Sequence, residues 1–246
     1  MKARTALTAI LALATAGALT TTAALAKPPR HPAVHSYILL DRTGSMEPIW
    51  SEALSSVNAY ADGLASLDGG PRVDADITLA VFDAQDGFQF DVLRKGVDAG
   101  EWNDVTSREV NPRGMTPLYD AIGRMVSLAE KDRPDKAVIV IMTDGEENSS
   151  TEMTKTSAKA ALDRVRAKGW EVVFLGANFD NISDASSVGV AAAQQMAMSA
   201  GTMERSLASL ARKSRVYAAS ARGEAPIAFD EEDRALAKEA NVKNKS

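Results

Sequence analysis

Continuous apolar runs along the chain indicate strands that are buried on both faces. The three clearest runs cover residues 36–40, 136–142 and 170–175. Continuous rather than alternating hydrophobicity is typical of central strands in a parallel sheet, because helices cover both faces of such a sheet. Residues 73–82 and 88–92, joined by a short turn, predict a hairpin and therefore one antiparallel edge strand.

Segments with apolar residues at helical spacing alternate with these strands. The first of these segments begins at Pro48, and the other three cover residues 116–128, 151–168 and 201–219. Residues 179–188 predict a short helix or loop, residues 191–198 a last edge strand, and residues 96–113 a long irregular connection. Strands that alternate with helices predict an α/β fold, with a mostly parallel central sheet and helices on both faces.

Two of the predicted strands end at a carboxylate. Asp41 follows the first apolar run, and Asp144 follows the run over residues 136–142. Right-handed crossovers place the carboxyl ends of parallel strands along one edge of the sheet, and ligands of such sheets bind at that edge. We therefore expect Asp41 and Asp144 to lie near each other.

The amino-terminal residues predict a secretory signal peptide. Lys2 and Arg4 precede an Ala- and Leu-rich core over residues 6–19, and residues 24–26 form a small-residue cleavage site. We expect export to the periplasm or the exterior, with no membrane insertion after cleavage. An uncleaved anchor is the alternative, but threonines interrupt the apolar core. The predicted parts are the signal peptide (1–26), a proline-rich leader (27–35), one domain (36–220) and a charged tail (221–246).

Composition narrows the classes of function. The formal net charge of −5 becomes −7 once Lys2 and Arg4 are removed, and no basic cluster is present, so nucleic acid is not an expected partner. The chain has no cysteine, which excludes disulfides and thiolate metal sites. His31 and His35, in or beside the leader, are expected to be solvated. Residues 229–234 predict a capped short helix in the tail.

The first predicted strand leads into a set of oxygen-bearing side chains. Asp41, Thr43 and Ser45 are spaced two residues apart, and Gly44 permits a tight turn between them. Carboxylate and hydroxyl oxygens on one loop suit a small hard cation such as Mg²⁺. Taken alone, this pattern is also ordinary turn chemistry.

Two further segments carry oxygens to the same predicted edge. Thr116 precedes Pro117 at the start of a helix, within the segment PRGMTPLYDAIG. Asp144 lies within Thr143-Asp144-Gly145 at the end of a strand. Alone, Thr116 would be an N-cap and Asp144 part of a turn. Their occurrence in order, each at the end of a predicted strand or start of a helix, favours a metal site.

These segments together resemble the metal-ion-dependent adhesion site of von Willebrand factor type A domains. The resemblance extends over nearly all of residues 36–220, through DRTGSM, PRGMTPLYDAIG, MTDGEENSS and FLGANFD, and is closest to bacterial and phage-type members. It implies a three-layer, Rossmann-like fold. The metal ligands it implies are Asp41, Thr43, Ser45, Thr116 and Asp144. Thr43 stands where serine is commoner in the family, but the hydroxyl is retained.

The resemblance also implies a function. In that family the metal is a divalent cation, here expected to be Mg²⁺ with Mn²⁺ or Ca²⁺ as alternatives. A Glu or Asp carboxylate of a partner protein completes its coordination. We therefore expect a non-enzymatic adhesion or docking module. Glu146, Glu147, Asn178 and Asp180 are expected at the rim of the site without binding the metal, and Asp120 is expected to have a capping or surface role, with a role behind the ligands as the alternative.

Two other functions stay open at this stage. A metal-assisted hydrolase, such as a phosphoesterase, could use a metal-bound water, with Arg42 and Arg113 near enough to bind an anion. Against it, the motifs contain no histidine, no cysteine and no phosphate-cradling loop with a lysine or arginine. Alternatively the metal could serve folding alone.

Overall fold

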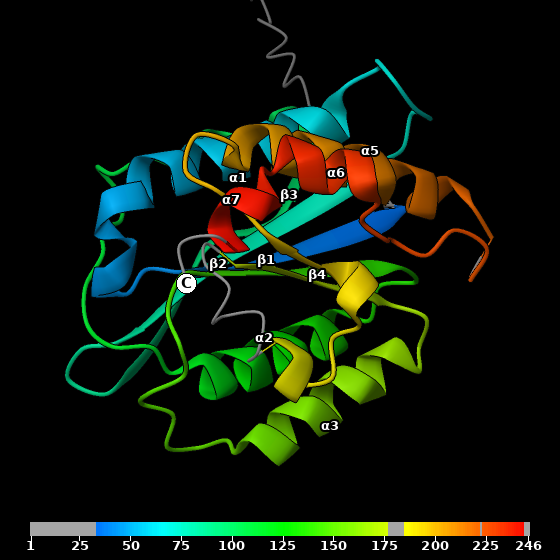
Figure 1. Ribbon diagram of the computed structural model, residues 1–246. Coiled ribbons are helices and arrows are strands. Elements are labelled where there is room, and N and C mark those ends of the chain that lie inside the picture. The colour runs from blue at the N-terminus through cyan, green and yellow to red at the C-terminus, as the bar shows by residue number, and fades with distance from the viewer. Residues whose placement is uncertain (1–32, 177–184, 222, 244–246) are drawn as a thin grey trace, which may run out of the picture. The chain divides into compact units, whose positions relative to one another are not determined.

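The computed structural model describes residues 33–176, 185–221 and 223–243, which form a six-stranded sheet between helices (Figure 1). The strand order is β3-β2-β1-β4-β5-β6. All neighbouring strands are parallel except the pair β2 and β3. The predicted α/β fold with one antiparallel edge strand is thereby confirmed. The strands are β1 (Val34–Asp41), β2 (Ala75–Ala84), β3 (Phe88–Asp98), β4 (Ala137–Thr143), β5 (Glu171–Gly176) and β6 (Gln195–Ala197).

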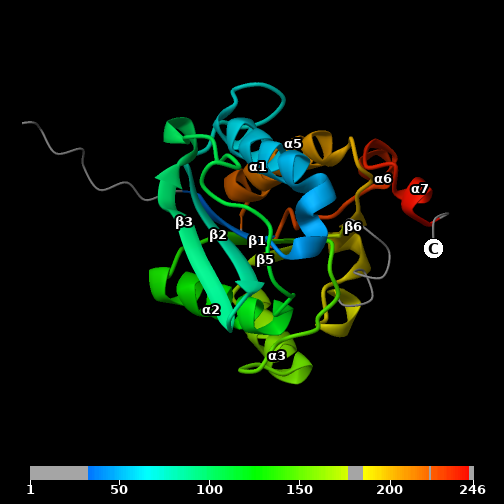
Figure 2. The same cartoon turned by 90° about the vertical axis from the view of Figure 1, so that its left-hand side faces the viewer.

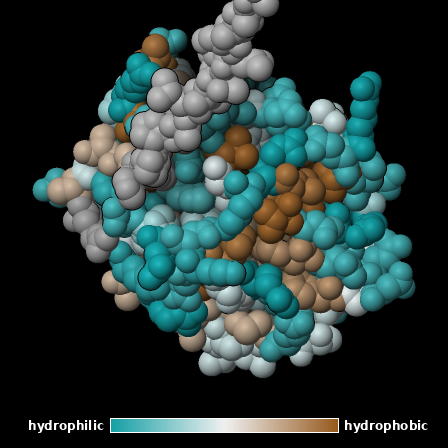
Figure 3. Space-filling model, turned by 180° about the vertical axis from the view of Figure 1, so that it is seen from behind, coloured by the Kyte–Doolittle hydropathy of each residue, from teal (hydrophilic) through white to brown (hydrophobic). Residues whose placement is uncertain are grey.

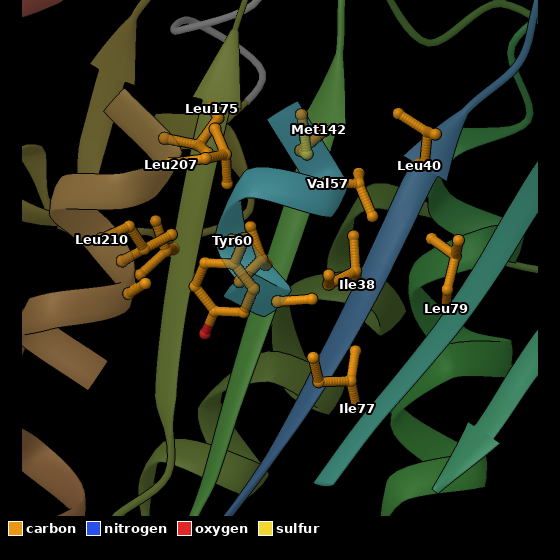
Figure 4. Packing of buried hydrophobic residues seen from close by; sticks show 14 of the residues in the cluster. Ile38, Leu40, Val57, Tyr60, Ile77, Leu79, Met142, Leu175, Leu207 and Leu210 are labelled. Atoms are coloured by element: carbon orange, nitrogen blue, oxygen red, sulfur yellow. The ribbon is translucent and has the colours of Figure 1, made fainter. Parts of the chain in front are cut away.

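Helices cover both faces of the sheet (Figure 2). One face packs against α1 (Trp50–Ala65) and α5 (Met203–Ala219), and the other packs against α2 (Leu118–Asp132) and α3 (Lys155–Arg166). Figure 4 shows the core on the first face, where aliphatic side chains of β1 and β2 meet those of α1 and α5. Helices α1 and α5 approach so closely that a Cβ on Gly63 would lie 2.6 Å from Cβ of Ala211, which explains a glycine inside α1.

The central strands fix where the candidate residues lie. Every residue of β1 and β4 is buried, as their continuous hydrophobicity predicted. The register aligns Leu40 of β1 with Met142 of β4, and Asp41 with Phe82 of β2. The carboxyl ends of three neighbouring strands therefore lie side by side, because parallel strands run in the same direction.

Two predictions about the ends of β1 and β3 need correction. Strand β1 begins at Val34, and His35 is 8% exposed rather than solvated. Its ring stacks on Tyr37 with 4.1 Å between centroids, and its Nε2 lies 2.8 Å from Thr78 Oγ1. Strand β3 continues to Asp98, into the segment predicted to be irregular, and is followed by the short helix η2 (Ala99–Glu101).

All four of these helices begin later than predicted, by two residues in α1, α2 and α5 and by four residues in α3. Helix α1 is preceded by a 3₁₀ turn, η1 (Gly44–Ile49), which contains Pro48. Helix α3 begins at Lys155, capped by Thr154, whose Oγ1 accepts a hydrogen bond from Ser157 N. The residues between β4 and α3 instead form a loop at the edge of the sheet, and other side chains hold this loop in place.

The carboxyl-terminal part of the chain packs on the same domain. A short turn, η3 (Ala192–Gln194), leads into β6, the predicted last edge strand. The predicted capped helix is α6 (Glu231–Leu236), in which Asp230 and Asp233 form a capping box, and α7 (Glu239–Lys243) follows it. Ser209 of α5 donates a 2.6 Å hydrogen bond to the buried Asp233, which ties α6 to the domain.

Within residues 33–176, 185–221 and 223–243, no helix combines the length and the apolar character needed to cross a membrane. The predicted signal peptide (1–26) lies outside these residues, and so do residues 177–184 of the predicted helix or loop at 179–188.

Candidate metal centre

The carboxyl ends of β1 and β4 bring the five predicted ligands together. Asp41 is the last residue of β1, and Thr43 and Ser45 follow it. Thr116 precedes α2, and Asp144 follows β4. The residues come from three segments separated by more than 20 residues each, yet hydrogen bonds connect their side chains.

Asp41 is a fully buried carboxylate held by neutral donors. Its Oδ1 accepts a hydrogen bond from Thr43 N at 2.7 Å, and its Oδ2 accepts one from Thr143 Oγ1 at 2.5 Å. Burial raises the pKa of Asp41 to about 7, although these donors lower it and the nearby Asp144 raises it further. Within the described residues, no Lys, Arg or His lies within ion-pair distance of Asp41. Its negative charge is therefore incompletely compensated.

The other four side chains form a ladder of oxygens beside Asp41. Thr116 Oγ1 lies 3.4 Å from Thr43 Oγ1, which lies 3.0 Å from Ser45 Oγ. Ser45 Oγ in turn donates a 2.7 Å hydrogen bond to Asp144 Oδ1. Burial also raises the pKa of Asp144, against the hydrogen bond from Ser45, which lowers it. Thr43 and Thr116 are buried, whereas Ser45 is exposed and Asp144 half-buried, so the ladder runs from the interior to the surface.

Two glycines let the loops approach this closely. A Cβ on Gly145 would lie 2.7 Å from Thr116 Oγ1 and 3.4 Å from Ser45 Oγ. A side chain there would enter the space next to both hydroxyls. Gly114 has φ +71°, and a Cβ on it would lie 2.8 Å from the backbone carbon of Ala84. Both positions therefore require glycine for the loops to keep this arrangement.

Backbone hydrogen bonds clamp the loop that carries Thr116. Arg113 N donates to Arg42 O at 2.7 Å, and Gly44 N donates to Gly114 O at 3.2 Å. Met115 and Ala84 pair as an isolated β-bridge with bonds of 2.9 and 3.3 Å. The loop is thus fixed to β2 and to the turn that carries Thr43 and Ser45, before any ligand binds.

Two carboxylates with a structural role hold the loop after β4. Asp120 is 2% exposed and accepts hydrogen bonds from the backbone N–H groups of Thr151, Glu152 and Met153 at 2.6–3.0 Å. Glu147 accepts from Tyr119 N at 2.9 Å, at the start of α2. Asp120 therefore has a capping role, the first of the two predicted alternatives, because it accepts from backbone N–H groups of this loop and not from the side chain of a predicted ligand. The amide donors are more than 25 residues away in sequence, so sequence analysis could not identify them.

Another buried carboxylate, Asp83, forms ion pairs with the two arginines near the site. Asp83 accepts 2.5 Å and 3.2 Å hydrogen bonds from the Nε atoms of Arg42 and Arg113. Arg42 is 6% exposed and also donates to Asp91 at 2.5 Å. Arg42 is therefore already engaged on both sides, and the expectation that it could bind an external anion is not supported by its surroundings.

The donor set suits a hard divalent cation. It consists of oxygens only: two carboxylates, one of them buried with a raised pKa, and three hydroxyls within hydrogen-bond distance of one another. In the described part of the chain, this site included, no group of three or more His, Cys, Asp or Glu side chains is placed to hold a metal ion. Glu146 is exposed beside the ladder, whereas Asn178 and Asp180 lie outside the described residues.

Solved structures with the same arrangement of strands and helices identify the fold. The vWF domain of the type V pili tip protein Mfa5 from Porphyromonas gingivalis superposes with a TM-score of 0.56 at 9% identity, over 78% of this chain and 98% of that one. The fold is that of a von Willebrand factor type A domain. No family model and no curated protein sequence matches the chain.

Other proteins with this von Willebrand A fold are longer than the chain. The pilus adhesin SpaC from Lactobacillus rhamnosus GG superposes with a TM-score of 0.53 at 15% identity, over 74% of this chain and 31% of that one. Proximal thread matrix protein 1 from the mussel byssus gives a TM-score of 0.51 at 13% identity, over 74% and 45%. The chain thus spans less than half of the length of these two proteins, and the likeness is one of fold.

Proposed function

We propose that this von Willebrand A domain is a non-enzymatic docking module that binds a divalent cation, Mg²⁺ in the first place, through Asp41, Thr43, Ser45, Thr116 and Asp144. The observation that carries the proposal is the convergence of oxygen-bearing side chains from three segments around Asp41, a buried carboxylate that has no basic partner among the described residues. A divalent cation would supply the missing positive charge, and a carboxylate with a raised pKa gains most from such a partner.

Charge and coordination number argue that the bound ion would accept an external ligand. The two carboxylates together balance a dication, and the three hydroxyls add contacts without adding charge. A hard cation takes about six oxygen ligands, so five protein side chains leave room for water or another oxygen. Because Ser45 is exposed and Asp144 is half-buried, the outer end of the ladder faces the surface, where a partner's Glu or Asp can reach it.

The surroundings favour docking over hydrolysis. Among the described residues the single histidine is His35, which is buried at the opposite end of β1 from Asp41. Arg42 is bound to Asp83 and Asp91. General acid–base catalysis needs a group of suitable pKa within reach of the reacting atoms, and neither of these side chains meets that requirement.

The proposal also includes the place where the domain acts. Mfa5 and SpaC are a pilus tip protein and a pilus adhesin, and this chain begins with residues that predict a signal peptide. We infer that the domain acts after export, in the periplasm or outside the cell, on another protein.

Metal binding is tested by titrating Mg²⁺ and Mn²⁺ into the purified protein in a calorimeter. The wild type should bind one ion, and Asp41→Asn should not. Asp86→Asn is the matched control, because Asp86 is an exposed carboxylate in the β2–β3 turn outside the ladder. Equal binding by the wild type and Asp41→Asn would contradict the proposal.

Docking is tested separately with a labelled peptide that contains one glutamate in an otherwise neutral sequence. Its binding should require the cation, disappear with EDTA and be lost in Asp41→Asn. Metal binding that raises the melting temperature without any peptide binding would indicate a folding role only. Turnover of phosphate or sulfate esters that Asp41→Asn abolishes would indicate a hydrolase.

A further inference from the structure

Strand β3 has one edge that no other strand of the described residues covers. It is the first strand in the order β3-β2-β1-β4-β5-β6 and pairs with β2 alone. Its first half pairs regularly, from Phe88 opposite Ala84 to Val92 opposite Ala80. An edge strand presents backbone N–H and C=O groups that can pair with another extended chain.

The two halves of this edge differ in how well they are protected against pairing with another strand. After Val92 the pairing shifts register twice, and Gly96 has φ +58°. Arg94 and Lys95 in this half form ion pairs with Glu109 and Asp132. Bulges and charged side chains are the usual devices that keep an edge strand from pairing further. The first half has no bulge, and its one charged side chain, Asp91, is bonded to Arg42.

A groove of about 660 Å³ runs beside the unprotected half, between β3 and α2. Phe88, Phe90 and Val92 line it from the strand, and Arg124, Leu128 and Lys131 line it from the helix. Val92 is 40% exposed, one of the few large apolar side chains that are so open. Figure 3 shows the face of the molecule that carries β3, with a hydrophobic patch bordered by hydrophilic side chains.

The helix side of the groove is basic. Arg124 lies over the Phe88 ring, 5.8 Å from its centroid, and pairs with Glu152 at 3.1 Å in an exposed ion pair, which contributes little. Lys131 is exposed, and no carboxylate of the described residues lies within ion-pair distance of it. The groove thus combines three apolar side chains of β3, beside Gln89 and Asp91, with two accessible cations of α2.

We propose that an extended segment of a partner protein adds a strand to β3 along Phe88–Val92. Alternate side chains of an extended segment point to one face, so its apolar residues would enter the groove beside Phe90 and Val92. Acidic residues at its ends would face Arg124 and Lys131. The partner segment is therefore an extended strand in which apolar residues and one acidic residue at each end point to the same face, toward the groove, and it is bound through backbone pairing. This surface goes beyond the metal-dependent docking proposed above, and its contacts need no cation.

The probe is a fluorescein-labelled, capped peptide, titrated by fluorescence anisotropy at low salt in EDTA. Its alternate positions carry glutamate, valine, valine and glutamate with threonine between them, so that the valines and both glutamates share one face; it is called the valine–glutamate peptide. We expect binding that Val92→Lys weakens about tenfold, because a charge would be buried against the groove. Val216→Lys is the matched control: Val216 lies on α5, is 45% exposed, and its replacement should leave the affinity unchanged. Amide hydrogen exchange should show new protection confined to residues 88–92.

The charge argument has its own test. Arg124→Glu combined with Lys131→Glu should weaken the valine–glutamate peptide about fivefold at low salt. The same double variant should bind a valine–lysine peptide better than the wild type does.

Five results would overturn the proposal. Four of them are no binding of the valine–glutamate peptide up to about 1 mM, equal weakening of binding by Val92→Lys and Val216→Lys, binding that appears only with Mg²⁺, and new hydrogen-exchange protection outside β3. A dimer in sedimentation that Val92→Lys dissociates would assign the edge to a second copy of the chain and would also overturn it. Failure of the metal titration would leave these measurements unaffected, so the two proposals can fail separately.

Discussion

Asp41 and Asp83 end neighbouring parallel strands of one sheet, and both side chains are completely buried. Asp83 accepts hydrogen bonds from the guanidinium groups of Arg42 and Arg113. Among the described residues, Asp41 accepts hydrogen bonds from Thr143 Oγ1 and from the backbone N–H and the hydroxyl of Thr43, which are all neutral donors. The same residue type at adjacent strand ends is therefore neutralised by the chain in one case and not in the other. Burial alone therefore does not separate a candidate metal ligand from a structural carboxylate; the lack of a basic partner among the described residues does.

The largest expected effect is on stability, at the neutralised carboxylate. Asp83→Asn leaves the buried Arg42 guanidinium without its closest anion, so we expect the free energy of unfolding to fall by about 3 kcal/mol. Urea denaturation in EDTA measures it. Asp91→Asn is the control, because Asp91 also binds Arg42 but its side chain is 49% exposed, and it should cost at most about 1 kcal/mol. Equal costs would mean that burial of Asp83 does not matter.

The same substitution at Asp41 should weaken metal binding and leave the stability without metal undiminished. Asp41→Asn removes a buried charge without a basic partner, while an amide can still bond to Thr43 N and Thr143 Oγ1. In EDTA the stability should stay equal to or exceed that of the wild type at neutral pH. Binding of Mg²⁺ should fall at least about 100-fold, about 2.7 kcal/mol, because one of the two ligating charges is lost. A variant as unstable as Asp83→Asn would remove the contrast between the two carboxylates.

The pH dependence sharpens the comparison. The pKa of Asp41 is about 7 in the folded protein against an ordinary value of 3.8, so between these values the folded state holds a proton that the unfolded state has lost. Without metal, this group lowers the free energy of unfolding as pH rises from about 4 to about 7. Bound Mg²⁺ favours the ionised form, so the stabilisation by Mg²⁺ should be larger at pH 8 than at pH 5.

His35 also makes the stability depend on pH, with the opposite sign, so its contribution has to be separated from that of Asp41. Burial lowers its pKa from 6.5 to about 4, so the folded state binds fewer protons between these values and stability rises with pH there. The difference between wild type and Asp41→Asn, measured in EDTA at each pH by urea denaturation, isolates Asp41. A difference that does not vary between pH 4 and pH 7 would contradict the assignment.

The neutral ligands should matter less. Thr116→Val keeps the shape of the side chain and removes one hydroxyl, so we expect Mg²⁺ affinity to fall about tenfold, less than for either aspartate. Thr202→Val is the control, because Thr202 is also buried but binds the carbonyl groups of Ser199 and Ala237, away from the ladder. Calorimetry compares the two, and equal affinities of Thr116→Val and the wild type would remove Thr116 from the proposed ligands.

The sequence predicted the parts of the site that depend on strand ends, and missed those that depend on distant partners. Continuous apolar runs placed Asp41 and Asp144 at one edge, because hydrophobicity determines which strands are central. Asp83 follows the apolar run over residues 73–82 as Asp41 follows the run over residues 36–40, so the sequence pattern does not separate the two carboxylates. The guanidinium groups that reach Asp83 distinguish them in the structure. The buried His35 was misjudged because β1 begins at Val34, inside the predicted leader, and because Thr78, which contacts its ring, is 43 residues away in sequence.

The smallest expected effect concerns Thr43, the one ligand that departs from the commoner serine of the family it resembles. Its hydroxyl lies between those of Thr116 and Ser45, and its backbone N–H holds Asp41, so both contacts depend on atoms that serine also has. Thr43→Ser should therefore change Mg²⁺ affinity by less than about twofold. The methyl group is buried, since the residue is 1% exposed, so stability should fall by about 1 kcal/mol. A large loss of affinity at unchanged stability would mean that the methyl group fixes the position of the hydroxyl, and calorimetry beside urea denaturation separates the two.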